Sequence, residues 1–511
     1  MYRNTTGQLN TAFGSDALRE NITASYNTAV GSKSLYTNTT GNSIVAVGND
    51  AFYKNTTASS GTAVGVQAGY NNTTGINNTF IGKSSASSNT TGGYNTALGT
   101  DSLRSNTTAS NNTAVGYQAG YSNTTGTRNT LIGSLAGDAL TDADDNVAIG
   151  QTALGSDTLG SKSTAIGRAA LATQNFTSAT DSYNTAVGFQ AGEAVTTGVQ
   201  NTLIGGLAGD AITTGEANTA VGYNSLGANT TANANVAVGY QSLSVNTTGT
   251  SNTALGTNTL VANTTASNNT AVGYNALTSN TTGSENAGLS DSALQLNTTG
   301  NYNSAAGRGA LNVNTTGSSN SAFGMLALSA NTTASNNTAV GYQAGYSNTG
   351  ASNLFAGTYA GYHTTTGTDN TYVGNSAGPN VSSSTGSYNT ALGASALVSN
   401  TTANNNTAVG YQSLYANTTG SQNTAFGRNA MLSNTTAGNT TGLGYGALRD
   451  NTTGAGNTGV GRLAAATNTT GNYNTALGNT ALYVSTTGAS NTALGYESLY
   501  SNTTASNNTA V

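Results

Sequence analysis

A short motif, Asn-Thr-Ala-Val-Gly, returns about every 17 residues along this chain. One copy begins at Asn27, and the motif is still in phase at Asn508. With degenerate copies included, 30 openings give 29 intervals, and 26 of these are 17 residues long. The other three intervals are 21, 16 and 19 residues long and begin at Ser163, Asn337 and Asn370. A strict short period indicates one small structural unit stacked on itself.

No shift in composition and no linker interrupts this period. We therefore predict that residues 1–511 form a single continuous array of about 30 repeats. The sequence begins and stops in the middle of a repeat, so we expect an array that is open, without caps, at both ends. Such an array is either a piece of a longer protein or a unit whose ends stack on other copies.

Each repeat can be numbered from its Asn as position 1, and Asn406–Gln422 is close to the consensus. Positions 2–4 and 6–10 carry Thr, Val, Tyr, Ala and Leu, which predicts two short strands. Position 5 is Gly, and positions 12–17 are rich in turn residues. A repeat this short is too small for a pair of helices. We predict an all-β fold, a parallel β-solenoid (β-roll or β-helix) of 17-residue coils.

Coils that stack at about 4.8 Å would give a rod on the order of 140 Å long. Identical residues would then lie above one another. We therefore expect side-chain ladders of Asn at position 1 and of Thr at position 2.

Positions 3 and 4 are both apolar, although neighbouring strand residues point to opposite faces. Position 9 is usually Leu but is Gly in eight repeats. Position 3 is mostly Ala but carries a large side chain in five repeats. Each large residue follows a repeat whose position 9 is Gly, as Leu131 follows Gly120. Gly137, Gly209 and Gly378 break the pattern, because Ala follows them. Since packed interiors conserve volume, we expect positions 3 and 9 to touch inside the coil. Copying of double repeats is an alternative origin of the pattern.

If position 3 faces inward, position 4 forms an outer row of mostly Val, Ile, Leu and Phe. A row of this length is a larger apolar strip than a soluble monomer normally exposes. We therefore predict lateral self-association, with three chains around an axis. The residues expected to carry it include Val30, Val115, Ile132, Val221, Val272, Val340 and Val409.

Composition excludes several classes of protein. Charged residues make up 6% of the chain and the net charge is −5, with no basic stripe that could neutralise phosphates. Nucleic acid is therefore not an expected partner. The apolar runs are too short to insert into a membrane, and no disulfide is possible without Cys. The periodic apolar positions argue against disorder.

Asn112–Gly126, which reads Asn-Thr-Ala-Val-Gly-Tyr-Gln-Ala-Gly-Tyr-Ser-Asn-Thr-Thr-Gly, resembles the repeats of phage and bacterial tail-fibre-like proteins. Asn146–Gly150 is similar to the Ser-Val-Ala-Ile-Gly repeats in the heads of trimeric autotransporter adhesins. The resemblance covers nearly the whole chain. It implies a left-handed parallel β-roll assembled as a trimer, although the adhesin coils are shorter. Nothing in the sequence matches the self-cleaving chaperone domain that often ends tail-fibre relatives.

Residues that could carry chemistry are few. His363 is the single histidine, and we expect it to be a plain surface residue. An acidic group at Asp138, Asp142, Asp144 and Asp145 matches neither an EF-hand nor the nonapeptide calcium repeat, so we expect a solvated turn. No Gly-Lys-Ser/Thr phosphate loop occurs. We expect no enzyme activity, no cofactor and no metal.

The turns contain 21 copies of Asn-Thr-Thr, 20 of them with Asn at position 12. Each is formally an acceptor for N-glycosylation, and each could equally cap a turn through side-chain hydrogen bonds. The candidate glycosylation sites include Asn38, Asn55, Asn106, Asn246, Asn263, Asn331, Asn417 and Asn502. The inserted residues before Asn184 and the region around Pro379 are expected to bulge from the coil. They are either tolerated growth of a loop, which we favour, or contact points for other molecules.

The sequence thus predicts a non-enzymatic structural or adhesive fibre, such as a tail fibre or the shaft of a cell-surface filament. Its expected location is extracellular, on a virion or on a cell surface. Its expected partners are further copies of itself and an unknown cell-surface receptor or glycan. An N-glycosylated extracellular filament is one alternative. A solenoid that binds ice, or another ligand, through rows of Thr is a second alternative.

Overall fold

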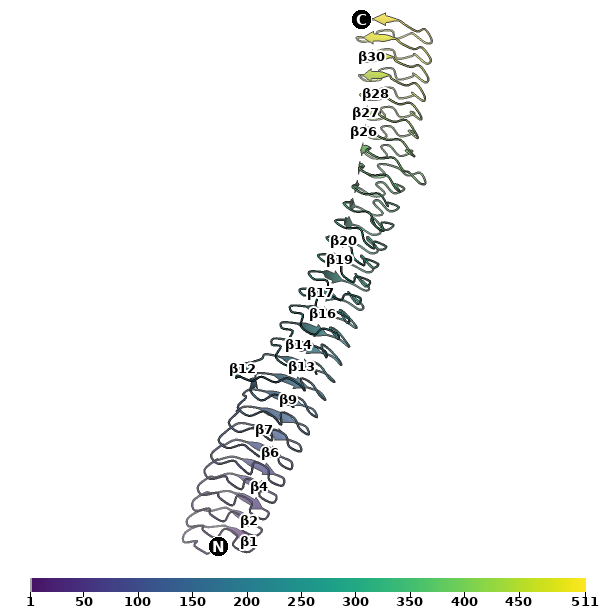
Figure 1. Ribbon diagram of the computed structural model, residues 1–511. Helices are drawn as coiled ribbons and strands as arrows, with labels where there is room; N and C mark the ends of the chain where they lie inside the picture. The colour runs from purple at the N-terminus through teal and green to yellow at the C-terminus, as the bar shows by residue number, and fades with distance from the viewer. Residues whose placement is uncertain (1) are drawn as a thin grey trace. The chain divides into compact units, whose positions relative to one another are not determined.

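The computed structural model describes residues 2–511, and within that range the chain forms strands, turns and loops but no helix. Two compact units divide the chain, Met1–Leu255 and Gly256–Val511. Each unit is a stack of similar coils (Figure 1).

The strands of the first unit are three residues long, except for two strands of two residues, which lie in neighbouring coils. They are β1 (Thr11–Phe13), β2 (Thr28–Val30), β3 (Val45–Val47), β4 (Thr62–Val64), β5 (Thr79–Ile81), β6 (Thr96–Leu98), β7 (Thr113–Val115), β8 (Thr130–Ile132), β9 (Val147–Ile149), β10 (Gly160–Ser161), β11 (Thr164–Ile166), β12 (Thr180–Asp181), β13 (Thr185–Val187), β14 (Thr202–Ile204), β15 (Thr219–Val221), β16 (Val236–Val238) and β17 (Thr253–Leu255).

The second unit repeats the same short strand once in every coil. Its strands are β18 (Thr270–Val272), β19 (Ala287–Leu289), β20 (Ser304–Ala306), β21 (Ser321–Phe323), β22 (Thr338–Val340), β23 (Leu354–Ala356), β24 (Thr371–Val373), β25 (Thr390–Leu392), β26 (Thr407–Val409), β27 (Thr424–Phe426), β28 (Thr441–Leu443), β29 (Thr458–Val460), β30 (Thr475–Leu477), β31 (Thr492–Leu494) and β32 (Thr509–Ala510).

Within each unit, the strand of one coil pairs in parallel with the strand of the next coil, position by position. In the first unit, for example, Thr113 pairs with Thr130 and Val115 pairs with Ile132. In the second unit, Thr407 pairs with Thr424 and Val409 with Phe426. The prediction of a parallel β-solenoid with 17-residue coils is confirmed. Its handedness and the number of associated chains stay predictions.

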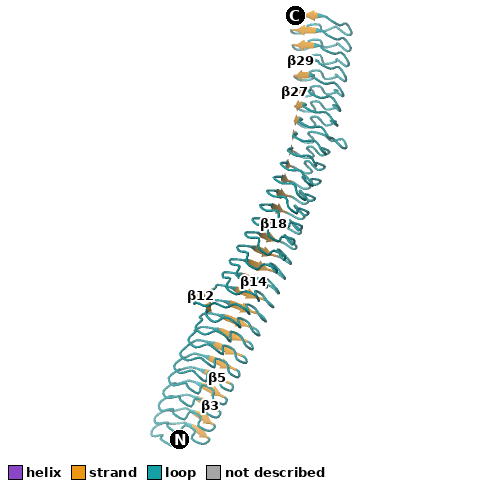
Figure 2. Cartoon of the chain, in the orientation of Figure 1, coloured by secondary structure: helices purple, strands orange, loops and turns teal. Residues whose placement is uncertain are grey.

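The prediction of two strands per coil is wrong, because positions 6–10 form consecutive turns (Figure 2). Positions 7 and 9 adopt the left-handed backbone conformation, as at Asp101 (φ 58°) and Leu103 (φ 46°). A strand cannot contain such residues at alternate positions. These turns still bond along the stack, since the Leu103 amide donates to the Ala119 carbonyl at 3.0 Å.

Position 5 favours glycine for two reasons, and it is glycine in all but one of the described coils. Gly31 has φ of 127°, a conformation essentially restricted to glycine. A Cβ added there would also lie 2.5 Å from the carbonyl oxygen of Gly48 in the next coil. The sharp bend after each strand therefore depends on this residue.

The lumen of each coil is closely packed, and position 3 lies inside it as predicted. Ala114, Phe80 and Leu131 are fully buried, whereas the position-4 residues are at least partly exposed. Leu103 at position 9 is also fully buried. The lumen can therefore hold one large side chain at position 3 or at position 9.

Buried asparagines form two ladders inside the stack. At position 1, the amide of Asn112 donates to Oδ1 of Asn95 at 3.0 Å, and Nδ2 of Asn112 donates to the Gly126 carbonyl at 2.8 Å. At position 12, Nδ2 of Asn106 donates to Oδ1 of Asn89 at 2.7 Å. The ladder predicted at position 1 is confirmed, and the second ladder is a finding of the structure.

The threonines at position 2 stack in register as predicted, as Thr113 does with Thr130, and a second threonine row at position 13 forms hydrogen bonds along the stack. Oγ1 of Thr107 donates to the Thr124 carbonyl of the next coil at 3.0 Å. Thr113, at position 2, is half-buried on the outer side of its strand. The hydroxyl of position 13 reaches the next coil because it lies in a turn beside the stacked backbone.

The 21-residue interval after Ser163 lies partly inside the coil, and partly bulges as predicted. Phe176 is buried, and Thr180–Asp181 (β12) pairs in parallel with Gly160–Ser161 (β10). Asp157 replaces the ladder asparagine and accepts a hydrogen bond from Nε2 of Gln174 at 2.7 Å. The inserted Thr177, Ser178 and Ala179 are exposed.

The 19-residue interval that begins at Asn370 also lies partly inside the coil and partly bulges from it. Pro379 is buried, and its carbonyl accepts a hydrogen bond from the amide of His363 at 3.2 Å. The residues that protrude are the exposed Asn380, Ser382 and Ser383.

Candidate functional site

The sheet of each unit exposes positions 2 and 4 of its strands, and we call this surface the sheet face. All seven residues predicted for self-association are the third residue of a strand. Ile132 and Val340 are 36% and 46% exposed, and the other five are half-buried. None of the three-residue strands within residues 2–511 contains Asp, Glu, Lys or Arg. The sheet face is therefore an uncharged surface of apolar side chains and threonines.

Threonine forms the second row of the sheet face. Thr113, Thr130 and most of their equivalents at position 2 lie beside the outer row at position 4. Strand partners match residue for residue, so each unit repeats the same pair of side chains at every coil. The regular threonine surface therefore lies on the sheet, at the position 2 where the sequence predicts a threonine ladder.

The asparagines predicted as glycosylation sites point inward. Seven of the eight are no more than 1% exposed, and Asn502 is half-buried. In each of the eight, Nδ2 donates a hydrogen bond to the carbonyl at position 15 of its own coil, at 2.9–3.2 Å. A glycan is bonded to this same nitrogen, and the lumen has no room for one. At the seven buried positions, the folded structure is incompatible with glycosylation, and the asparagines bond the turn.

The other residues considered for chemistry do not form a reactive site. His363 packs edge-on against Tyr362, with ring centroids 4.5 Å apart. Asp145 pairs with Arg128, and the Arg128 guanidinium lowers the pKa of this carboxyl. Asp144 accepts hydrogen bonds from Thr127. Among residues 2–511, no group of three or more His, Cys, Asp or Glu side chains could hold a metal ion.

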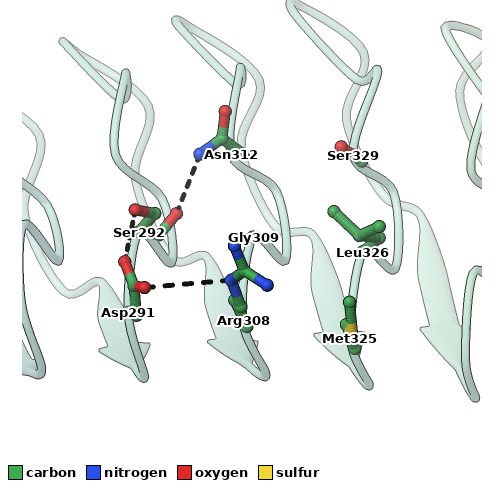
Figure 3. Close-up of a pocket in the computed structure, with 8 residues that line it drawn as sticks. All are labelled: Asp291, Ser292, Arg308, Gly309, Asn312, Met325, Leu326 and Ser329. Atoms are coloured by element: carbon green, nitrogen blue, oxygen red, sulfur yellow. Dashed lines mark hydrogen bonds and ion pairs between the residues drawn. The ribbon is translucent and has the colours of Figure 1, made fainter.

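A pocket of ≈ 300 Å³ opens between three successive coils of the second unit (Figure 3). It is lined by Asp291, Ser292, Arg308, Gly309, Asn312, Met325, Leu326 and Ser329. These residues come from positions 6, 7 and 10 of their coils.

Gly309 leaves the space for this pocket. Position 7 normally carries a longer side chain, such as Gln118 or Gln343, and Gly309 and Gly446 are its two glycines. A Cβ added at Gly309 would lie 2.9 Å from Cδ2 of Leu326. The pocket is therefore a local departure from the repeat and not a feature of every coil.

The polar groups around the pocket are held in place by one another. Oγ of Ser292 donates to Oδ1 of Asp291 at 2.6 Å, and Nδ2 of Asn312 donates to the Ser292 carbonyl at 3.1 Å. Nε of Arg308 lies 3.8 Å from Oδ2 of Asp291, an ion pair too long for a hydrogen bond. The sequence analysis missed this group, and the absence of a position-7 side chain at Gly309 was the signal that could have revealed it.

Ser290, directly before Asp291, has an unusual backbone. It occupies position 5, where a glycine conformation is needed, and its φ is 138°. Its amide still donates to the Val272 carbonyl at 2.8 Å, so the stack imposes this conformation on a serine. Ser290 lies in the first of the three coils that form the pocket.

Comparison with known proteins gives no family for this chain. No protein-family model matches the sequence, and neither does any curated protein. Within residues 2–511 there is also no helix long and apolar enough to cross a bilayer. The function must therefore be argued from the repeat, the sheet face and the pocket.

Proposed function

We propose that this chain is a non-enzymatic structural fibre, the shaft of an adhesive filament of the tail-fibre or cell-surface kind, which works outside the cell or on a virion. The uncharged sheet face is the observation that carries this proposal. It continues coil after coil in each unit, and Ile132 and Val340 are more than a third exposed on it. A surface of this kind is stabilised when another molecule covers it.

A second copy of the chain is the partner that fits the sheet face best. A copy carries the same rows at the same spacing, so every coil can repeat the same contact between chains. Three chains around one axis would cover all three sheet faces at once. The resemblance to tail-fibre repeats and adhesin heads also supports an assembly of three chains.

Charges placed on the sheet face test this proposal. Val115→Asp, Ile132→Asp and Val221→Asp, combined in one chain, should dissociate the assembly, because carboxylates would be buried between apolar surfaces. The matched control is Thr74→Asp, Thr108→Asp and Thr197→Asp, also combined in one chain, at position 14, where Asp142 occurs naturally and is exposed. Light scattering should show a fall in size for the first variant only. An unchanged size in both would contradict self-association through the sheet face.

Ice binding is a second candidate, and the threonine row of the sheet face favours it. Thr113 and Thr130 are half-exposed on a regular sheet, where hydroxyl and methyl groups repeat at the strand spacing of about 4.8 Å. Such a surface can order water as a lattice. It requires a free sheet face, so it competes with self-association. Thermal hysteresis in a solution of the chain, lost after substitution of Thr113 and Thr130 by Lys, would favour this candidate.

A further inference from the structure

The pocket at Gly309 is a local departure from the repeat in a region where the 17-residue period is kept. It combines a missing side chain, a strained serine and a group of hydrogen-bonding side chains within three coils. Strained backbone conformations persist where the structure holds them, and they concentrate at functional sites. We propose that this pocket binds one neutral sugar ring, the terminal unit of a glycan.

The charges of the pocket favour a neutral ligand. Asp291 and Arg308 carry opposite charges and lie 3.8 Å apart, so a ligand with a net charge would meet no excess of the other sign. Both side chains are also open to solvent, with 47% and 70% exposed, and exposed ion pairs contribute little to binding.

A sugar hydroxyl matches these groups because it both donates and accepts hydrogen bonds. One hydroxyl can donate to the Asp291 carboxylate and accept from the Arg308 guanidinium, which are too far apart to bond each other directly. Ser292, Asn312 and Ser329 supply further polar groups at the rim.

Leu326 and Met325 provide the apolar side of the pocket (Figure 3). A sugar ring has a C–H face that packs against such side chains, while its hydroxyls point to the polar side. The volume of ≈ 300 Å³ is at the lower end for ligand pockets, which suits a single ring.

This inference rests on the proposed fibre function, to which it would add the adhesive contact. The two are measured separately. Sugar binding is read by calorimetry, whereas self-association is read by the size of the assembly. A chain that binds sugar but does not self-associate would contradict the fibre proposal alone, and a chain that self-associates without binding sugar would contradict the pocket proposal alone.

The experiment titrates the full chain with glucose, galactose, mannose and N-acetylglucosamine, and with glycine as a zwitterionic comparison. We expect millimolar binding of at least one sugar. Gly309→Gln fills the pocket with the side chain that position 7 carries at Gln118 and Gln343, and should weaken binding at least tenfold. Gly446→Gln makes the same change outside the pocket and should leave binding unchanged.

Asp291→Asn gives a second readout that does not depend on filling the pocket, and it should also weaken binding at least tenfold. Three results would overturn the proposal: no sugar binds the unmodified chain, glycine binds in preference to every sugar, or binding persists in both Gly309→Gln and Asp291→Asn.

Discussion

Leu131 occupies the space that a side chain at Gly120 would need, although the two residues belong to successive coils. A Cβ at Gly120 would lie 2.7 Å from Cδ1 of Leu131, and a Cβ at Gly137, in the same coil as Leu131, would lie 2.7 Å from its Cδ2. Leu203 stands in the same relation to Gly192 and Gly209. A large residue at position 3 therefore requires space at position 9 of both the preceding coil and its own.

This exchange of volume predicts a compensating pair of substitutions. Gly120→Leu alone should destabilise the chain by about 1–3 kcal/mol through overpacking. Leu131→Ala alone should cost about 2–5 kcal/mol through the cavity it leaves. The double variant restores the common pairing of Ala at position 3 with Leu at position 9, and should be more stable than the sum of the single effects allows. Urea midpoints measure all three, and strictly additive effects would contradict the shared volume.

The asparagine ladder and the glycosylation sequon can be separated at Asn106. Asn106→Ala leaves its ladder neighbours Asn89 and Asn123 without one partner each, and should cost about 1–3 kcal/mol. Thr108→Ala removes the sequon but keeps the asparagine, and Thr108 is exposed, so the unfolding midpoint should stay the same. Equal losses in the two variants would contradict the structural role of Asn106.

Ser290 should be a site where glycine improves stability. Ser290→Gly relieves a backbone strain of about 1–3 kcal/mol, which exceeds the entropy that glycine loses on folding. The reverse change, Gly307→Ser, introduces the same strain at position 5 of the next coil, where a Cβ would lie 2.5 Å from the carbonyl of Gly324. Thermal unfolding should shift upward for the first variant and downward for the second.

Asp210 predicts a change of stability with pH. Burial raises the pKa of its carboxyl, and the neighbouring carboxylate of Glu193 raises it further. The folded chain therefore keeps this carboxyl protonated up to a higher pH than the unfolded chain does. The stability that the bound proton contributes is fully present below the unfolded pKa and is lost as the pH rises through the folded pKa. Asp210→Asn should raise the urea midpoint at pH 7 and have little effect below about pH 4. Asp369→Asn, at an exposed carboxyl, serves as the control. An equal rise of the urea midpoint of Asp210→Asn at both pH values would contradict the raised pKa as its cause.

The fold could be predicted from the sequence because each position of the coil has its own chemical requirement. The 17-residue period predicts the solenoid. The compensation in side-chain volume between Leu131 and Gly120 predicts that position 3 points inward. The exceptions at Gly137, Gly209 and Gly378 could not be explained from sequence order alone. In the structure, each lies in the same coil as its large partner, as Gly378 does with Tyr372.

Two features escaped the sequence for physical reasons. Leu103 lies in the run at positions 6–10 that predicts a second strand, yet it adopts a left-handed conformation that the stacked coils impose. Asn106 has the pattern of a surface glycosylation site, yet it lies in the lumen, because its Nδ2 donates hydrogen bonds both to the turn and to the asparagine of the preceding coil. The pocket also depends on three coils at once, and in the sequence only the glycine at Gly309, compared with position 7 of the other repeats, marks it.

The mass of the unmodified chain in solution tests the central claim most directly, since the account requires sister chains to cover the sheet face. Sedimentation equilibrium should give three times the single-chain mass of 50.5 kDa. A folded particle of 50.5 kDa at every concentration would contradict it.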